Sequence, residues 1–194
     1  MHLSIDKPRH TARTRLRGIG DADLDDLYAY RSLPAVFRYI PGEPMTREQV
    51  QDAIATRWAR RSIDTEGEGV RIGVELVSSG HLIGDVSLWV ASLHDSCGEI
   101  GWILNPTFTG QGFATEAAHG VLHLAFSELG LRRVIARVDA RNTASLRLAT
   151  RLGMRQEAHL VENELFKGEL TDEIDFALLS REFEALPHIA GCLI

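Results

Sequence analysis

The segment from residue 99 to residue 138 most constrains the fold. An apolar run that begins at Glu99 ends before Asn105-Pro106, and apolar side chains then recur at helical spacing up to Leu129. Gly130 stops that helix, and the alternating apolar residues of 134–138 predict a strand. A strand, a helix and a second strand in this order form a parallel pair with a right-handed crossover. The chain is therefore predicted to contain a sheet with a helix packed on its face.

The residues on either side of this segment predict mostly antiparallel strands. The strands are expected over 12–17, 70–77, 82–90, 154–162 and 172–180, and the helices are expected to begin at Asp21 or Asp23, at Thr46 and at Asn142. Thr46 and Gln49 form a capping box, which marks a helix start. The predicted fold class is mixed α/β (α+β), with a mostly antiparallel sheet of six to seven strands, helices on both faces and one central β-α-β crossover.

The composition excludes several classes of protein. A chain of 194 residues has the length of one domain, which we expect over 12–181, with an N-terminal extension over 1–11 and a C-terminal tail over 182–194. The net charge of −6 disfavours a nucleic-acid partner. No apolar run is long enough to span a membrane, and the first 20 residues lack the apolar core of a secretory signal. We therefore expect a cytoplasmic protein in which Cys97 and Cys192 are unpaired thiols.

Two glycines, Gly110 and Gly112, lie between the strand that ends at Leu104 and the long helix. Such a loop can turn its backbone N–H groups inward, and together with the positive end of the helix these groups form an anion site. A phosphate or pyrophosphate fits this site, but the same pattern is found in ordinary tight turns. The P-loop sequence is missing, and Thr115 occupies the last glycine position of a dinucleotide-binding loop. The loop by itself leaves both interpretations open.

Longer strings carry a resemblance to a known family. The string P-T-F-T-G-Q-G-F-A-T-E-A at 106–117 resembles the acyl-CoA pyrophosphate loop of the GNAT N-acetyltransferases, and it is closest to their RimJ/RimL-like branch. The N-T-A-S of 142–145, followed by the L-G-M of 152–154, is similar to the N-x-x-S…L-G-F segment of that branch. Residues 34–39 resemble its early substrate-side region, and residues 162–173 resemble its loop before the last strand. The resemblance covers residues 12–181 and implies the GNAT fold.

The resemblance also implies an activity. It implies transfer of an acetyl group from acetyl-CoA to a primary amine, by direct attack in a ternary complex. The acceptor is either a protein N-terminal amine or a small-molecule amine, and we expect a monomer or a homodimer. The alternative is a CoA-binding sensor or regulatory module without turnover. The residues implied to bind acetyl-CoA are Ile103, Leu104, Gly110, Gln111, Gly112, Phe113, Ala114, Thr115, Asn142, Ser145 and Arg147.

Two positions depart from the superfamily pattern. Thr109 stands where many members have Gln or Arg, so one side-chain contact to the ligand is missing. Ala149 stands where many members have a tyrosine that protonates the leaving thiolate, and an alanine cannot do this. A general acid would then have to come from elsewhere.

Two catalytic candidates follow from position in the predicted elements. Ser145 shares an apolar, inward helix face with Leu148 and Leu152, so it points toward the sheet, although a first-turn serine can also bond its own backbone. Asn142 is expected as the N-cap of this helix. Glu99 begins the strand before the glycine loop, where a carboxylate can accept a proton from an amine through water, although it can equally be a surface glutamate.

Seven arginines between 132 and 155 form a local basic cluster. Such a cluster suits the phosphates of CoA, although most of these arginines are expected on a solvated face. His119 and His123 have a spacing that can bind a metal, but no third ligand accompanies them, so we expect surface histidines and no metal site. Trp58, Trp89 and Trp102 are expected in the core.

Overall fold

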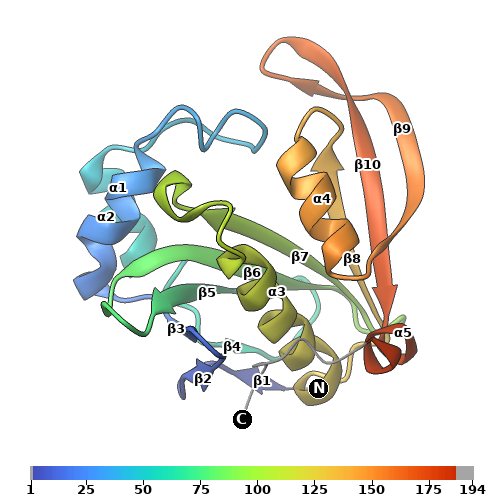
Figure 1. Cartoon of the computed structure of the whole chain (residues 1–194), viewed down its shortest axis with the longest axis horizontal. Coiled ribbons are helices and arrows are strands. Elements are labelled where there is room, and N and C mark those ends of the chain that lie inside the picture. Colours follow the sequence, from blue (N-terminus) through green and yellow to red (C-terminus); the bar gives the residue numbers. More distant parts are fainter. Residues whose placement is uncertain (1, 187–194) are drawn as a thin grey trace.

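The computed structural model describes residues 2–186 as five α-helices, ten strands and short turns of other helix types (Figure 1). The strands are β1 (Leu3–Ser4), β2 (Arg9–His10), β3 (Thr14–Gly18), β4 (Ser62–Ile63), β5 (Gly69–Leu76), β6 (Leu82–Ser92), β7 (Cys97–Leu104), β8 (Arg133–Asp139), β9 (Arg155–Phe166) and β10 (Glu169–Leu179). The helices are α1 (Leu24–Arg31), α2 (Arg47–Ala55), α3 (Phe113–His123), α4 (Thr143–Arg151) and α5 (Ser180–Ala185).

The main sheet has eight strands in the order β2-β3-β5-β6-β7-β8-β10-β9, and β1 pairs with β4 in a separate small sheet. The prediction of a mostly antiparallel mixed sheet with helices is confirmed, because β7 and β8 form the one parallel pair among the described strands. The strand count of six to seven was one too low. The additional strand is β2, whose two residues are too few to show an alternation in the sequence.

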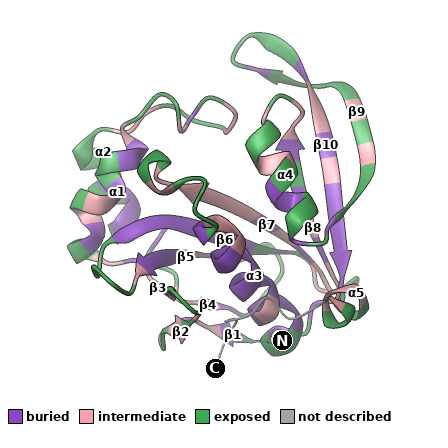
Figure 2. Cartoon of the chain, in the orientation of Figure 1, coloured by how far each residue is buried: buried purple, intermediate pink, exposed green. Residues whose placement is uncertain are grey.

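Helices cover both faces of the sheet, as neighbouring residues of β6 show. The Asp85 carboxylate accepts a hydrogen bond from Tyr30 of α1, whereas Val86 packs in the large core that also contains α3. Successive side chains of a strand point to opposite faces, so α1 and α3 lie on opposite sides of the sheet. A smaller core beneath α1 and α2 contains Ile19, Leu27 and Val50. Figure 2 shows β6 and α3 largely buried, whereas β9 is exposed along most of its length.

The parallel pairing of β7 with β8 is short. It joins Cys97, Gly98 and Glu99 to Arg133, Val134 and Ile135 and does not continue beyond Glu99 and Ile135 in the described chain. Both strands extend further, β7 to Leu104 and β8 to Asp139, so the sheet opens into a gap between them (Figure 1). This gap positions the functional site.

The predicted helix starts are confirmed. Thr46 Oγ1 accepts a hydrogen bond from the Gln49 N–H, and the Gln49 side chain accepts one from the Thr46 N–H. Asn142 caps α4, because its side-chain oxygen accepts a hydrogen bond from the Ser145 N–H at 3.2 Å. These caps satisfy N–H groups that a helix leaves without partners in its first turn.

Three of the side-chain expectations need correction. Trp58 is buried, but Trp102 is only partly buried and Trp89 is 47% exposed, so the tryptophans do not all belong to the core. His119 is buried against the Phe183 ring, with centroids 4.8 Å apart, and is therefore not a surface histidine. The apolar face of α3 continues around this histidine, which explains its burial.

Residues 2–186 contain no group of three or more His, Cys, Asp or Glu side chains placed to hold a metal ion. None of the described helices has the length and apolar character needed to cross a bilayer. Cys97 is a free, partly buried thiol, and Cys192 lies outside the described residues.

Candidate active site

The glycine loop before α3 has the backbone conformation that its sequence predicts. Gly110 and Gly112 have φ angles of +76° and +85°, in the left-handed region that favours glycine. Gly112 is the N-cap of α3, so the loop delivers free N–H groups at the positive end of an 11-residue helix. A Cβ atom at Gly110 would meet nothing within 4 Å, which leaves the backbone open to an approaching ligand. The loop can therefore bind an anion through its amides.

Arg13, which precedes β3, is held against this loop. Its Nε atom donates to Glu116 Oε2 at 2.7 Å, its Nη1 atom donates to the Gln111 carbonyl at 3.0 Å, and its guanidinium lies 4.4 Å from the centre of the Phe113 ring. Glu116 is buried, and burial alone would raise its pKa, but hydrogen bonds from Thr11 and Arg13 outweigh burial and lower the pKa. Glu116 therefore stays ionised and fixes the Arg13 charge beside the loop.

Arg151, at the end of α4, reaches the same loop from the other side. Its Nε atom lies 3.3 Å from the Thr115 hydroxyl. Arg13 and Arg151 together provide two positive charges next to the free amides, which suits a ligand with more than one phosphate charge. No local sequence pattern indicates a role for Arg13, because about a hundred residues separate it from the loop. Arg147, which the resemblance implied, is exposed and does not line the cavity described next.

A cavity of about 1080 Å³ extends from the glycine loop into the gap between β7 and β8. Trp102, Ser145 and Leu148 line it on the α3 and α4 side, and residues 35–36 and 38–40 line it on the α1 and α2 side together with Ile103. The cavity therefore passes through the sheet and is bordered by both faces. It brings together most of the predicted cofactor-binding residues: Ile103, Leu104, Gly110, Gly112, Phe113, Ala114, Thr115, Asn142 and Ser145. Gln111 and Glu99 do not line it, although the Gln111 carbonyl anchors Arg13.

Ser145 and Trp102 face each other across the gap. Trp102 Nε1 donates a hydrogen bond to Ser145 Oγ at 3.2 Å, so this hydroxyl faces a strand rather than its own helix backbone. Leu148 and Ala149 are buried on the inward face of α4, as the spacing predicts. Ala149 places no polar group beside the gap. Ser145 is therefore the hydroxyl that α4 presents to the cavity.

Glu99 lies where the gap begins, on the opposite face of the sheet from Trp102. One of its oxygens is 3.8 Å from Arg137 Nη2. Strand register places Asp175 beside Arg137 on the same face, and Asp175 Oδ1 is buried without a hydrogen-bond partner among the described residues. Glu173, two residues before Asp175, has a raised pKa because it is partly buried and lies near Asp175, while Arg137 opposes this shift. Carboxylates therefore outnumber cations on this side of the gap.

The family model of the acetyltransferase (GNAT) domain matches residues 13–155 of the chain. The chain belongs to the GNAT acetyltransferase family. It is 31% identical over 175 residues to the uncharacterized N-acetyltransferase p20 of Bacillus licheniformis, a match that covers 90% of this chain and 97% of the relative. It is 30% identical to the uncharacterized N-acetyltransferase YnaD of Bacillus subtilis, with 89% and 97% of the two chains covered.

Solved structures agree with this assignment. An acetyltransferase of the GNAT family from Bacillus anthracis superimposes with a TM-score of 0.80 at 26% identity, and the match covers 90% of this chain and 99% of that one. The chain is thus a GNAT N-acetyltransferase, and its co-substrate is acetyl-CoA. The loop amides, Arg13 and Arg151 fit the pyrophosphate of this co-substrate, and the cavity has room for the arm that follows it.

In this acetyltransferase two segments far apart in sequence close over the α1 and α2 side of the gap. Lys167, at the tip of the β9–β10 hairpin, donates to the Phe37 carbonyl at 3.0 Å and lies 3.3 Å from Glu43. The Arg141 guanidinium lies 5.7 Å from the centre of the Tyr39 ring and 5.9 Å from that of Phe166. Residues 34–39 resemble the early substrate-side region of the family and residues 162–173 resemble its loop before the last strand, and the structure brings the two segments into contact.

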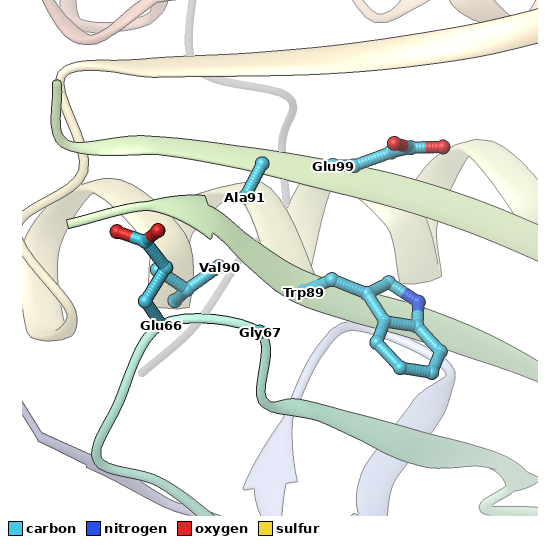
Figure 3. A pocket seen from close by; sticks show the side chains of 6 residues that line it. All are labelled: Glu66, Gly67, Trp89, Val90, Ala91 and Glu99. Atoms are coloured by element: carbon cyan, nitrogen blue, oxygen red, sulfur yellow. The ribbon is translucent and has the colours of Figure 1, made fainter.

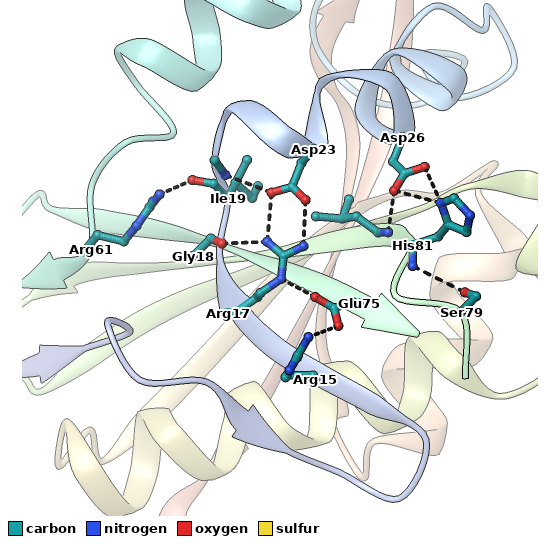
Figure 4. Close-up of polar contacts among 12 residues, drawn as sticks. Arg15, Arg17, Gly18, Ile19, Asp23, Asp26, Arg61, Glu75, Ser79 and His81 are labelled. Atoms are coloured by element: carbon teal, nitrogen blue, oxygen red, sulfur yellow. Dashed lines mark hydrogen bonds and ion pairs between the residues drawn. The ribbon is translucent and has the colours of Figure 1, made fainter. Parts of the chain in front are cut away.

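A network of charged side chains fixes α1 of the acetyltransferase to the sheet. Figure 4 shows Arg17 between Glu75 and Asp23, with its Nη2 atom 2.6 Å from Asp23, while Arg15 pairs with the other oxygen of Glu75. Hydrogen bonds and charges of this network raise the pKa of Arg17, against the opposing effect of burial. The network therefore keeps the start of α1 in place on this face of the sheet.

A second group of charged side chains, centred on the buried Asp85, also anchors α1. Asp85 accepts hydrogen bonds from Tyr30 at 2.6 Å and from Arg31 at 2.6 Å, and it also pairs with Arg71. Burial alone would raise the pKa of Asp85, but the charges of Arg31 and Arg71 and the Tyr30 hydroxyl lower it. The ion group ties α1 to β5 and β6 and thereby holds the loop that follows α1 over the cavity.

Proposed function

We propose that this enzyme transfers the acetyl group to a primary amine by direct attack in a ternary complex. The observation that carries the proposal is the cavity that passes through the sheet, because it lets two substrates approach one point from opposite faces. Cys97, at the start of β7, does not line this cavity, which disfavours an acyl-enzyme on that thiol. A CoA sensor without turnover is the alternative function. It would bind one ligand and would not need an opening on the second face of the sheet.

The binding roles follow from the positions of the residues. The amides of residues 110–114, with Arg13 and Arg151, bind the pyrophosphate, and Asn142 and Ser145 contact the arm that enters the gap. Past Glu99, alternate N–H groups of β7 point into the gap without a strand partner. These N–H groups polarise the thioester carbonyl and stabilise the charge that develops on its oxygen.

Glu99 is our candidate for the general base. An ammonium has no lone pair, so the amine must lose a proton before its nitrogen can form a bond to the carbonyl carbon. Glu99 stands where the gap opens and is half-buried, so a water molecule can carry this proton from the nitrogen to its carboxylate. The carbon–sulfur bond then breaks and the electron pair leaves on sulfur. Ala149 cannot protonate the thiolate, and Ser145 is the group that can donate a hydrogen bond to it.

The identity of the amine acceptor is a separate part of the proposal. The resemblance to the RimJ/RimL-like branch supports a protein N-terminal amine or a small-molecule amine. The excess of carboxylates beside the gap supports an acceptor with positive charge. We further propose a cytoplasmic enzyme that acts as a monomer or a homodimer.

Two measurements test the proposal. Release of free thiol from acetyl-CoA, with a panel of primary amines and mass spectrometry of the products, should show N-acetylated amines. Absence of turnover with tight acetyl-CoA binding would favour the sensor instead. Calorimetry should show that Gly112→Val loses acetyl-CoA affinity, because the new side chain occupies the approach to the loop near Arg13, 3.4 Å from the Cβ position.

Gly80→Val is the matched control for this variant. Gly80 also has a positive φ, of +74°, but it lies in the turn between β5 and β6, outside the cavity. It should lose stability through the same backbone strain and keep acetyl-CoA affinity. Equal affinity in wild type and Gly112→Val would show that the anion site is elsewhere.

A further inference from the structure

A second hollow, of about 530 Å³, lies on the same side of the sheet as the proposed acceptor. Figure 3 shows its lining: Trp89 of β6 and Glu99 of β7 on neighbouring strands, and Glu66 on the loop across from them. Gly67, Val90 and Ala91 complete the wall. Helices α1 and α2 do not cover this part of the sheet, and the Trp89 side chain is 47% exposed.

The groups of the hollow are held in place. The Trp89 indole lies against Gly69, where a Cβ atom would come within 2.5 Å of the ring. Glu66 Oε2 accepts a hydrogen bond from the Leu93 N–H at 2.8 Å. A fixed indole with an open face and a nearby carboxylate attract a cation, through the ring quadrupole and through charge.

The hollow adjoins the gap in which acetyl transfer is proposed. Trp89 and Glu99 are paired across the β6–β7 ladder, and cross-strand partners lie roughly 5 Å apart. Along the same face of β7, Gly101 follows Glu99 and carries no side chain, and Ile103 then lines the main cavity. No β7 side chain therefore separates the hollow from the cavity on this face.

We propose that the hollow binds a second positive charge of the acceptor, with Trp89 and Glu66 as specificity-determining residues. This inference rests on the proposed function, in which the reacting amine lies beside Glu99. A second ammonium about 5 Å away is reached by about three to four methylene groups at C–C distances of about 1.5 Å. The acceptor class is an amine with a second alkylammonium group, supplied either by a small diamine or by a lysine side chain next to a peptide N-terminus.

The kinetic test uses substrates that differ only in the second charge. Putrescine and n-butylamine share a carbon skeleton, and we expect kcat/KM for putrescine to be about fivefold to tenfold higher. Trp89→Leu and Glu66→Gln should lower this preference to about two, the statistical factor of two identical amines, and leave the rate with n-butylamine unchanged. Trp89→Phe, which keeps an aromatic face, should retain most of the preference.

A second pair of substrates distinguishes the two sources of the charge. The dipeptides Ala-Lys and Ala-norleucine differ only at the end of the second side chain. If Ala-Lys is preferred over Ala-norleucine more strongly than putrescine is preferred over n-butylamine, the second charge belongs to a peptide lysine. If the preference for putrescine is the stronger one, the second charge belongs to a diamine.

A binding test that does not need turnover separates this inference from the proposed function. Tetramethylammonium cannot be acetylated, and we expect it to shift the NMR signal of the Trp89 indole N–H, with weaker binding in Glu66→Gln. A shift without turnover of any amine would overturn the proposed function and leave the cation site in place. Turnover with a preference for putrescine of no more than about twofold, or a larger preference that survives Trp89→Leu, would overturn the cation site.

Discussion

On the face of the sheet that α1 and α2 partly cover, Asp85 and Asp175 have opposite surroundings. Asp85, on β6, is fully buried and accepts hydrogen bonds from Tyr30 and Arg31 as well as from Arg71. Asp175, three strands away on β10, has an oxygen with no partner in the described chain, although strand register places Arg137 beside it. We call these regions the paired half and the open half of the face.

The ionised side chains have different roles in the two halves. In the paired half every named carboxylate has cationic partners, so the charges hold α1 and its loop in position. In the open half, burial and then the nearby Asp175 carboxylate raise the pKa of Glu173, and a cationic ligand would favour its ionised form. We therefore expect substitutions in the paired half to affect mainly stability and substitutions in the open half to affect mainly the proposed reaction.

The largest expected effect is a loss of stability in Asp85→Asn. The substitution leaves the buried charge of Arg31 without its counter-charge, which costs about 3–5 kcal/mol of unfolding free energy. Urea denaturation followed by circular dichroism measures it. Asp175→Asn is the matched control and should change stability by less than about 0.5 kcal/mol. Similar losses in the two variants would contradict the division into halves.

The next effect concerns activity in the open half. Glu99→Gln should lower kcat/KM by about 10²-fold near neutral pH, because general-base catalysis contributes 10²–10⁴-fold. The remaining rate should rise more steeply with pH, since deprotonation of an alkylamine with a pKa near 10.4 then depends on solvent alone. Rates at saturating acetyl-CoA across the pH range test this, with the exposed Glu162→Gln as control. An unchanged pH profile would exclude Glu99 as the base.

Ser145→Ala should have a smaller effect. It removes the hydroxyl that accepts a hydrogen bond from Trp102 and that is proposed to donate one to the leaving sulfur. One such bond contributes about 0.5–1.5 kcal/mol, so the rate should fall by no more than about tenfold. A thiolate whose thiol has a pKa near 8.5 leaves without obligatory protonation. Single-turnover rates and acetyl-CoA affinity should be measured in parallel, with the exposed Thr143→Ala in the same helix turn as control. A loss larger than that of Glu99→Gln would make Ser145 an essential acid.

The smallest effect is a gain of stability in Glu173→Gln. The folded protein raises the pKa of Glu173, so the ionised carboxylate destabilises it at neutral pH. Removing the charge should raise the unfolding free energy by up to about 0.5 kcal/mol at pH 7. The gain should disappear as the pH falls below the unfolded-state pKa of about 4.3, where the wild-type side chain is also neutral. A gain that persists at low pH would have another cause.

The sequence predicted the parts of the molecule that local patterns determine. The helix caps at Thr46 and Asn142, the glycine loop and the helix face of α4 depend on residues within one or two turns of each other, and the central crossover follows from the order of three consecutive elements. The contact of Arg13 with Glu116 and the position of Arg151 depend on packing between distant elements, and no local pattern encodes them. The exposure of Trp89 and the burial of His119 have the same origin, because both depend on which elements cover a strand or helix.

The short contact between β7 and β8 also limits the strand pairing that joins the two parts of the main sheet. Three Cα-paired positions link the strands of the N-terminal part to those of the C-terminal part in the chain that the structure describes. A molecule bound in the cavity touches both parts and so acts as a tether between them. By linkage, this tether stabilises the native state by an amount that grows with the logarithm of the free ligand concentration. Acetyl-CoA bound as proposed would therefore add to the resistance of the enzyme to heat and proteolysis.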